Sequence, residues 1–101
     1  MDKLEASEVE AALRDLAGWS LGGDGGAIER SFRFKSFNAA FAFMTRAALL
    51  AEKMDHHPEW SNTYDRVEVR LTTHSAGGVT GNDLKMAKAM GRYATDVGLK
   101  G

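Results

Sequence analysis

Three histidines, His56, His57 and His74, are the side chains in this sequence best suited to proton transfer. Imidazole has an ordinary pKa of about 6.5, so it can donate or accept a proton near neutral pH. His56 and His57 are adjacent and precede Pro58, the one proline of the chain, and Glu52 lies one helical turn before His56. We therefore expect general acid/base catalysis at this segment, with His74 brought to it by the fold.

Other chemistries fit these residues less well. The three histidines could bind one metal ion, but the chain lacks the i, i+4 histidine pair of a zinc-binding helix, and adjacent side chains usually diverge. We therefore expect no metal site. Ser61 and Ser75 lie near histidines but outside any nucleophile-elbow pattern, and the glycine-rich residues 22–26 lack the strand-to-helix context of a phosphate loop.

Composition narrows the possible partners. With 101 residues the chain has the length of one domain, residues 1–101, and its 13 basic and 14 acidic residues predict neither a nucleic-acid nor a membrane partner. It contains no cysteine, which fits a reducing compartment. No segment approaches the roughly 20 apolar residues that span a bilayer, and none has a signal-peptide pattern. We expect a cytoplasmic protein.

The first third of the chain predicts a helix followed by a hairpin. Ser7 and Glu10 match a capping box, and apolar residues at helical spacing predict a short helix ending at Gly18. Polarity then alternates, and residues 22–26 form a turn rich in glycine. The apolar side of the second strand consists of Ile28, Phe32 and Phe34. Arg30 falls on that side and does not fit the alternation.

A long amphipathic helix positions the first two histidines. Ser36 is its expected N-cap, and Pro58 must end it, because proline lacks an amide donor and disfavours the α conformation at His57. Its predicted apolar face is broad and comprises Phe37, Ala40, Phe41, Phe43, Met44, Ala47, Ala48, Leu50 and Ala51. The end of this helix therefore carries Glu52 and the histidine pair.

Two further strands follow the proline. Trp60, Asn62 and Tyr64 have a spacing of two, which on a strand places them on one face, where the aromatic rings either stack on a flat heterocycle or fill the core. After a turn at residues 63–65, alternation continues through residues 66–74 and leaves His74 off the core face at the end of the strand.

The last helix begins with a second capping box, formed by Thr80 and Asp83. A carboxylate at this position accepts hydrogen bonds from backbone amides and opposes the helix dipole. Capping the helix is therefore a sufficient structural reason for Asp83. The predicted inward side of this helix comprises Leu84, Ala87, Met90, Tyr93, Ala94 and Val97. Gly98 can end it.

The predicted element order is helix, two strands, helix, two strands, helix. Strands joined as hairpins favour an α+β fold, with a four-stranded antiparallel sheet and three helices packed on one face. Such a sheet has exposed edges, which proteins usually pair or protect. We therefore expect a homo-oligomer, either a dimer or a tetramer.

The site segment resembles the pterin-4a-carbinolamine dehydratases. The matching residues are Glu52, His56-His57-Pro58, Trp60, Asn62, Tyr64, Thr73-His74, Gly77-Gly78, Thr80 and Asp83. The resemblance implies dehydration of a 4a-hydroxytetrahydropterin to the quinonoid dihydropterin, which recycles the pterin used by aromatic amino-acid hydroxylases. The tetrahydropterin is then the substrate, and no cofactor is expected.

The resemblance also implies roles for individual residues. His56 and His74 would be the acid/base pair, and His57 would orient the substrate. Glu52 and Asp83 would be supporting carboxylates, and Pro58 and Trp60 belong to the same substrate-binding set. Which histidine acts as the acid stays open. Some animal members of the family also act as dimerisation cofactors of a homeodomain transcription factor, so a non-catalytic protein-interaction module is the alternative function.

Overall fold

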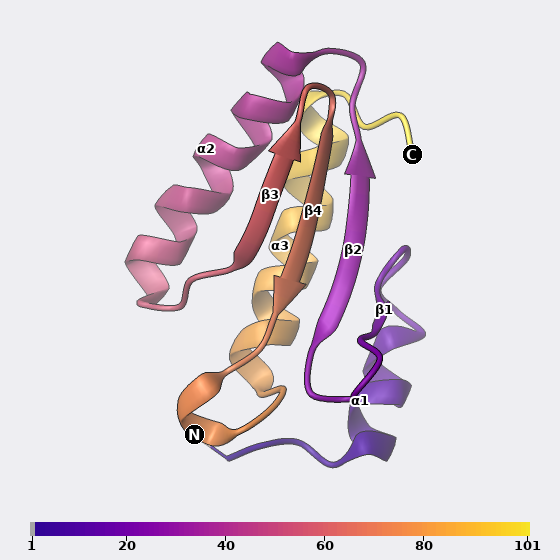
Figure 1. The fold of residues 1–101 in the computed structure, drawn as a ribbon, viewed down its shortest axis with the longest axis vertical. Helices are drawn as coiled ribbons and strands as arrows, with labels where there is room; N and C mark the ends of the chain where they lie inside the picture. The colour runs from indigo at the N-terminus through magenta and orange to yellow at the C-terminus, as the bar shows by residue number, and fades with distance from the viewer. Residues whose placement is uncertain (1) are drawn as a thin grey trace.

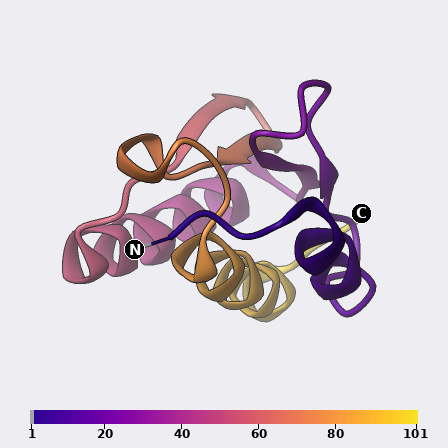
Figure 2. The same ribbon diagram turned by 90° about the horizontal axis from the view of Figure 1, so that it is seen from below.

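The protein is a four-stranded antiparallel sheet with three helices against one face (Figures 1 and 2). The computed structural model describes residues 2–101. Its elements are α1 (Ala6–Leu13), β1 (Ser20–Leu21), β2 (Ile28–Arg33), α2 (Phe37–Met54), β3 (Glu59–Thr63), β4 (Arg66–Leu71), a 3-10 turn η1 (His74–Ala76) and α3 (Gly81–Val97). The predicted α+β class and element order are confirmed.

The strand order β1-β2-β4-β3 places β4 inside the sheet, paired with both β2 and β3. Each of the two hairpins is local in sequence, whereas the β2–β4 pairing joins them. One row of paired residues crosses all four strands and consists of Ser20, Glu29, Arg70 and Glu59. The end of β4 therefore delivers the segment containing His74 to a point flanked by the first hairpin and β3.

The core lies between the sheet and the helices. Its largest fully buried apolar side chains are Ile28, Phe32, Phe34, Phe43, Val67, Leu71, Met86 and Met90. Phe43 of α2 packs on Phe32 of β2 and on Phe34, which follows that strand. Its ring centroid is 4.7 Å from that of Phe32 and 5.1 Å from that of Phe34. Among residues 2–101, no helix is both long and apolar enough to cross a membrane.

The apolar face of α2 is narrower than predicted. Phe37 is 46% exposed and Phe41 56% exposed, and Ala48 is exposed as well. The buried residues of this helix are Ala39, Ala40, Phe43, Ala47 and Ala51. With 3.6 residues per turn, Phe37, Phe41 and Ala48 fall on the flank of the buried stripe and not within it. The interpretation of Ser36 as N-cap is confirmed, because its side chain accepts a hydrogen bond from Ala39 N at 3.1 Å.

The capping box of α1 is formed by Glu5 and Glu8, so its assignment to Ser7 and Glu10 is wrong. Leu4 N donates to Val79 O at 2.8 Å, which keeps the chain extended until Glu5 and starts the helix directly after it. The helix ends at Leu13, and turns lead on to Gly18.

Arg30, the residue that breaks the alternation of β2, lies at the rim of the core. Its guanidinium carbon is 4.2 Å from the centroid of the Phe32 ring, a cation–π contact. Burial lowers the pKa of Arg30. Gly18 has φ +86°, and a Cβ there would come within 2.6 Å of Arg30 Nε. Glycine at position 18 therefore makes room for the guanidinium.

Candidate active site

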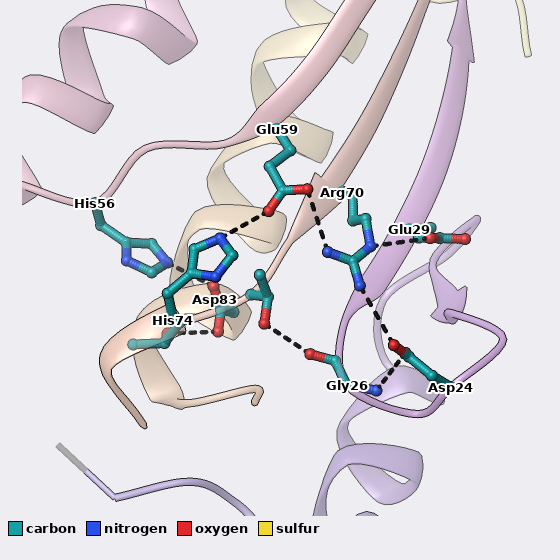
Figure 3. Close-up of polar contacts among 10 residues, drawn as sticks. Asp24, Gly26, Glu29, His56, Glu59, Arg70, His74 and Asp83 are labelled. Atoms are coloured by element: carbon teal, nitrogen blue, oxygen red, sulfur yellow. Dashed lines mark hydrogen bonds and ion pairs between the residues drawn. The ribbon is translucent and has the colours of Figure 1, made fainter. Parts of the chain in front are cut away.

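His56 lies buried just beyond the end of α2. Asp55 adopts a left-handed conformation with φ 51°, and His56 N donates to Ala51 O at 3.0 Å, which closes the helix before Pro58. The imidazole is 8% exposed, and its Nε2–H donates to Asp83 Oδ1 at 2.5 Å (Figure 3). The local signals that end the helix thus turn this histidine toward α3.

Asp83 is fully buried, and its carboxylate accepts hydrogen bonds from three partners. Its Oδ2 accepts from Thr80 N at 2.9 Å, which confirms the predicted capping box, and also from Thr73 Oγ1 at 2.8 Å. Its Oδ1 accepts from His56. The Thr73 hydroxyl also lies 2.8 Å from that of Thr80. Asp83 is therefore a helix cap and the partner of a buried imidazole.

His74 occupies the first position of the 3-10 turn, so its placement at the end of a strand is wrong. Strand β4 ends at Leu71 because Thr73 N bonds to Gly78 O at 2.9 Å and closes a turn, with Gly77 left-handed at φ 77°. The side chain of His74 is 82% exposed. Its Nε2–H donates to Glu59 Oε2 at 2.9 Å (Figure 3).

Glu59 was not predicted as a site residue, although the sequence holds a signal for it. It follows Pro58 directly and has the parity opposite to Trp60, so it points to the outer face of the sheet. Its second oxygen, Oε1, accepts from Arg70 Nη1 at 3.2 Å. Thr73 was likewise missed as a site residue, since its hydroxyl contact depends on the turn that follows β4.

His57 points to a third carboxylate. Its Nε2–H donates to Glu52 Oε1 at 2.6 Å, with both side chains more than half exposed. Glu52 therefore supports His57, not His56. Within residues 2–101, no three histidine, aspartate or glutamate side chains are grouped to hold a metal ion. Each imidazole instead has its own carboxylate acceptor, an arrangement suited to holding and moving protons.

The contacts of His56 and His74 come together at Thr73 and His74, which are adjacent in the chain. Thr73 directly precedes His74 in the chain and donates to Asp83, the partner of His56. Figure 3 shows His56 reaching to Asp83 and His74 reaching to Glu59. Residues from the end of α2, the start of β3, the turn after β4 and the start of α3 thus meet at one end of the molecule.

The three residues expected on one face of β3 do not share it. Trp60 and Asn62 are half-buried, and Trp60 packs against the core. Tyr64 lies beyond the strand, in the turn, with φ 51° and an exposed ring. Asn62 Nδ2 donates to Tyr64 O at 3.1 Å and to Arg66 O at 2.9 Å, so this amide stabilises the turn.

A shallow cavity of about 550 Å³ opens on the outer face of the sheet. Its lining includes Ser20, Glu29, Glu59, Glu68 and Arg70, which come from all four strands. None of its lining residues is a histidine. Glu59 therefore connects this outer face to the histidine cluster.

Comparisons with known proteins point to one family. The family model described as pterin 4 alpha carbinolamine dehydratase matches residues 2–93. A protein of Mesorhizobium japonicum, provisionally named a pterin-4-alpha-carbinolamine dehydratase, is 58% identical over 92 residues, which cover 91% of this chain and 94% of that protein. A Rhodopseudomonas palustris protein with the same provisional name is 55% identical over 94% of each chain.

Two solved structures are similar. The crystal structure of a transcriptional coactivator/pterin dehydratase from Brucella melitensis has a TM-score of 0.90 and 55% identity, covering 92% of this chain and 99% of that one. A pterin dehydratase-like protein identified as a RuBisCO assembly factor in the alpha-carboxysome has a TM-score of 0.66 and 20% identity, covering 76% and 89%. This second likeness shows the fold alone. On the family model and the relatives, the chain belongs to the pterin-4-alpha-carbinolamine dehydratase family.

Proposed function

We propose that this protein dehydrates a 4a-hydroxytetrahydropterin to the quinonoid dihydropterin and water. The observation that carries the proposal is the pair of histidine–carboxylate contacts, His56 with Asp83 and His74 with Glu59, linked through Thr73. Membership of the family supports the choice of substrate class. Two imidazoles with fixed acceptors supply the acid and the base that a dehydration needs.

The reaction requires two proton transfers. An acid protonates the 4a-hydroxyl so that the C4a–O bond can break and water can leave. A base takes the proton of the adjacent ring nitrogen, whose electrons form the new C=N double bond. No electrons are gained or lost overall, so the proposed chemistry needs neither a redox cofactor nor a metal.

The proposed roles follow the geometry of each imidazole. His56 and His74 form the acid/base pair, in either order. In both, a carboxylate accepts from Nε2–H, which leaves Nδ1 as the nitrogen free to exchange a proton with substrate. His57, exposed and held by Glu52, would orient the substrate from the side.

Stopped-flow ultraviolet absorbance on freshly generated 4a-hydroxytetrahydropterin tests the proposal. Wild-type protein should accelerate the decay of the substrate over its spontaneous dehydration. The double variant His56→Ala, His74→Ala should abolish this acceleration while its circular dichroism stays that of a folded protein. Failure of well-folded wild-type protein to accelerate the reaction would overturn the proposal.

The proposal extends to the protein's physiological setting. An aromatic amino-acid hydroxylase would supply the 4a-hydroxypterin, which makes such an enzyme the metabolic partner. We also propose a homo-oligomer, supported by three exposed apolar side chains of α2, which are Phe37, Phe41 and Leu49. Sedimentation velocity should show a dimer or tetramer, and a monomer at micromolar concentration would contradict this part.

A protein-interaction module is the second candidate function. The Brucella melitensis relative is described as a transcriptional coactivator as well as a pterin dehydratase, and the exposed apolar side of α2 could serve such a role. Three intact histidine–carboxylate pairs favour the enzyme, since a module without catalysis has no need of them. Co-purification of a second protein at fixed stoichiometry, with no dehydratase activity, would reverse the order of the two candidates.

A further inference from the structure

We propose that Glu59 is a positioning residue for His74, and that Arg70 in turn holds Glu59 in place. The inference rests on the proposed function, because it concerns the proton chemistry of His74. Its geometry can also be measured without any reaction. Neither residue belongs to the set of site residues that the sequence indicated.

The orientation of the His74 ring depends on one contact. The backbone at this residue is fixed by the turn, in which Ala76 N donates to Thr73 O at 3.0 Å and Gly77 N donates to His74 O at 3.1 Å. The side chain, however, is 82% exposed, and among residues 2–101 only Glu59 hydrogen-bonds to its ring. An exposed side chain without such a contact exchanges among staggered rotamers within nanoseconds. Glu59 is therefore the group that selects one ring orientation.

Glu59 can do this because its own carboxylate is held. Arg70 is its direct partner across the β3–β4 pair, and Arg70 Nη1 donates to Glu59 Oε1 at 3.2 Å. The guanidinium is held in turn from the other side, with its Nε 3.4 Å from Glu29 Oε2 on β2 and its Nη2 3.8 Å from Asp24 Oδ2 in the first hairpin (Figure 3). One oxygen of Glu59 is thus fixed by the sheet, and the other faces His74.

The contact has a chemical consequence as well as a steric one. An ionised carboxylate can only accept, so His74 Nε2 must carry a proton in both the neutral and the charged ring. The nitrogen that gains or loses the catalytic proton is then Nδ1. Without Glu59 the neutral ring could place its proton on either nitrogen. Glu59 therefore sets both the direction and the tautomer of His74.

Kinetics of three single variants test the inference. Glu59→Gln keeps the shape but removes the charge, and should lower kcat about tenfold, with KM changed less. Arg70→Gln should lower kcat by a smaller factor, about threefold, because exposed ion pairs are weak. Glu68→Gln is the matched control, since Glu68 is an exposed carboxylate on the same face of β4 as Arg70 and, within residues 2–101, makes no hydrogen bond to a histidine. Its kcat should equal that of wild type.

The double variant Glu59→Gln, Arg70→Gln tests whether Arg70 affects kcat by holding Glu59 or through a separate effect on the sheet. If Arg70 acts through Glu59, the double variant should be as slow as Glu59→Gln alone. If the loss of kcat in the double variant equalled the product of the two single losses, the assignment of Arg70 would be overturned. A wild-type kcat in Glu59→Gln would overturn the assignment of Glu59.

Nuclear magnetic resonance reports the rotamer and the tautomer of His74 directly. Neither should change if Glu59 only stabilised the sheet. Wild-type protein at pH about 8.5, where an ordinary imidazole is neutral, should show one χ1 rotamer in its three-bond couplings and a proton on Nε2 in long-range proton–nitrogen spectra. Glu59→Ala, which removes the contact, should show averaged couplings and a mixture of tautomers, whereas Glu68→Ala should match wild type. Identical spectra for Glu59→Ala and wild type would refute the positioning role.

The same spectra keep the two proposals apart. If wild-type protein is inactive, the proposed function fails, and the couplings and tautomer of His74 alone decide the positioning role. If wild-type protein is active but the His74 spectra do not respond to Glu59→Ala, the function stands and the positioning role falls.

Discussion

Replacing Asp83 with asparagine should separate its catalytic contribution from its role as a helix cap. The carboxylate accepts three hydrogen bonds, from His56 Nε2, Thr73 Oγ1 and Thr80 N, and is fully buried. Asparagine can accept at one oxygen only. Because the Thr80 N–H can only donate, that oxygen must stay on the side of Thr80 and Thr73, which preserves the cap. The amide nitrogen then faces His56.

The consequence for His56 is a reversed tautomer. An amide N–H can only donate, so His56 Nε2 must become an acceptor and the ring proton must move to Nδ1. The nitrogen assigned to proton exchange is then blocked as a base, and the charged ring has no acceptor. A lost acid/base function of this kind lowers kcat by about 10²-fold or more. Loss of one charge-assisted hydrogen bond should also lower the free energy of unfolding by about 1.5–3 kcal/mol.

Stopped-flow kinetics and urea unfolding on the same preparation measure both effects. Ser36→Ala is the matched control, because Ser36 caps α2 through Ala39 N and lies outside the histidine network. This control should lose about 1 kcal/mol of unfolding free energy and keep the kcat of wild type. If Asp83→Asn kept kcat within about threefold of wild type, Asp83 would be only a helix cap and the tautomer argument would be refuted.

Three further variants test other parts of the structure. His74→Ala should lower kcat about 10²-fold without measurable loss in urea unfolding, since its side chain is 82% exposed, and a large stability loss would contradict its exposed placement. Phe43→Ala should lower the free energy of unfolding by about 3–5 kcal/mol, because its ring is fully buried, and a loss below about 1 kcal/mol in urea would contradict that packing. Glu52→Gln should change stability by less than about 1 kcal/mol, because its pair with His57 is exposed, and should raise KM more than it lowers kcat if His57 orients substrate.

The sequence predicted where a helix begins or ends wherever a single capping residue or a proline determines that boundary. Ser36 and Thr80 begin their helices as expected, and Pro58 follows the end of α2. The predictions failed where a contact with a segment distant in sequence determines a helix boundary or the burial of a side chain. The contact of Leu4 with Val79 moves the start of α1, and the sheet covers only one side of α2, which leaves Phe37 exposed.

The candidate site divides in the same way. The sequence by itself determined which side chains can carry protons, that His56 and His57 lie at a helix end, and that Asp83 caps a helix. Their pairing was decided by tertiary structure, since His56 and Asp83 are 27 positions apart and His74 and Glu59 are 15 apart. Hydrogen bonds of this range depend on strand register and on how distant segments dock. Neither is encoded in local spacing, so the carboxylate partners of His56 and His74 emerged only from the fold.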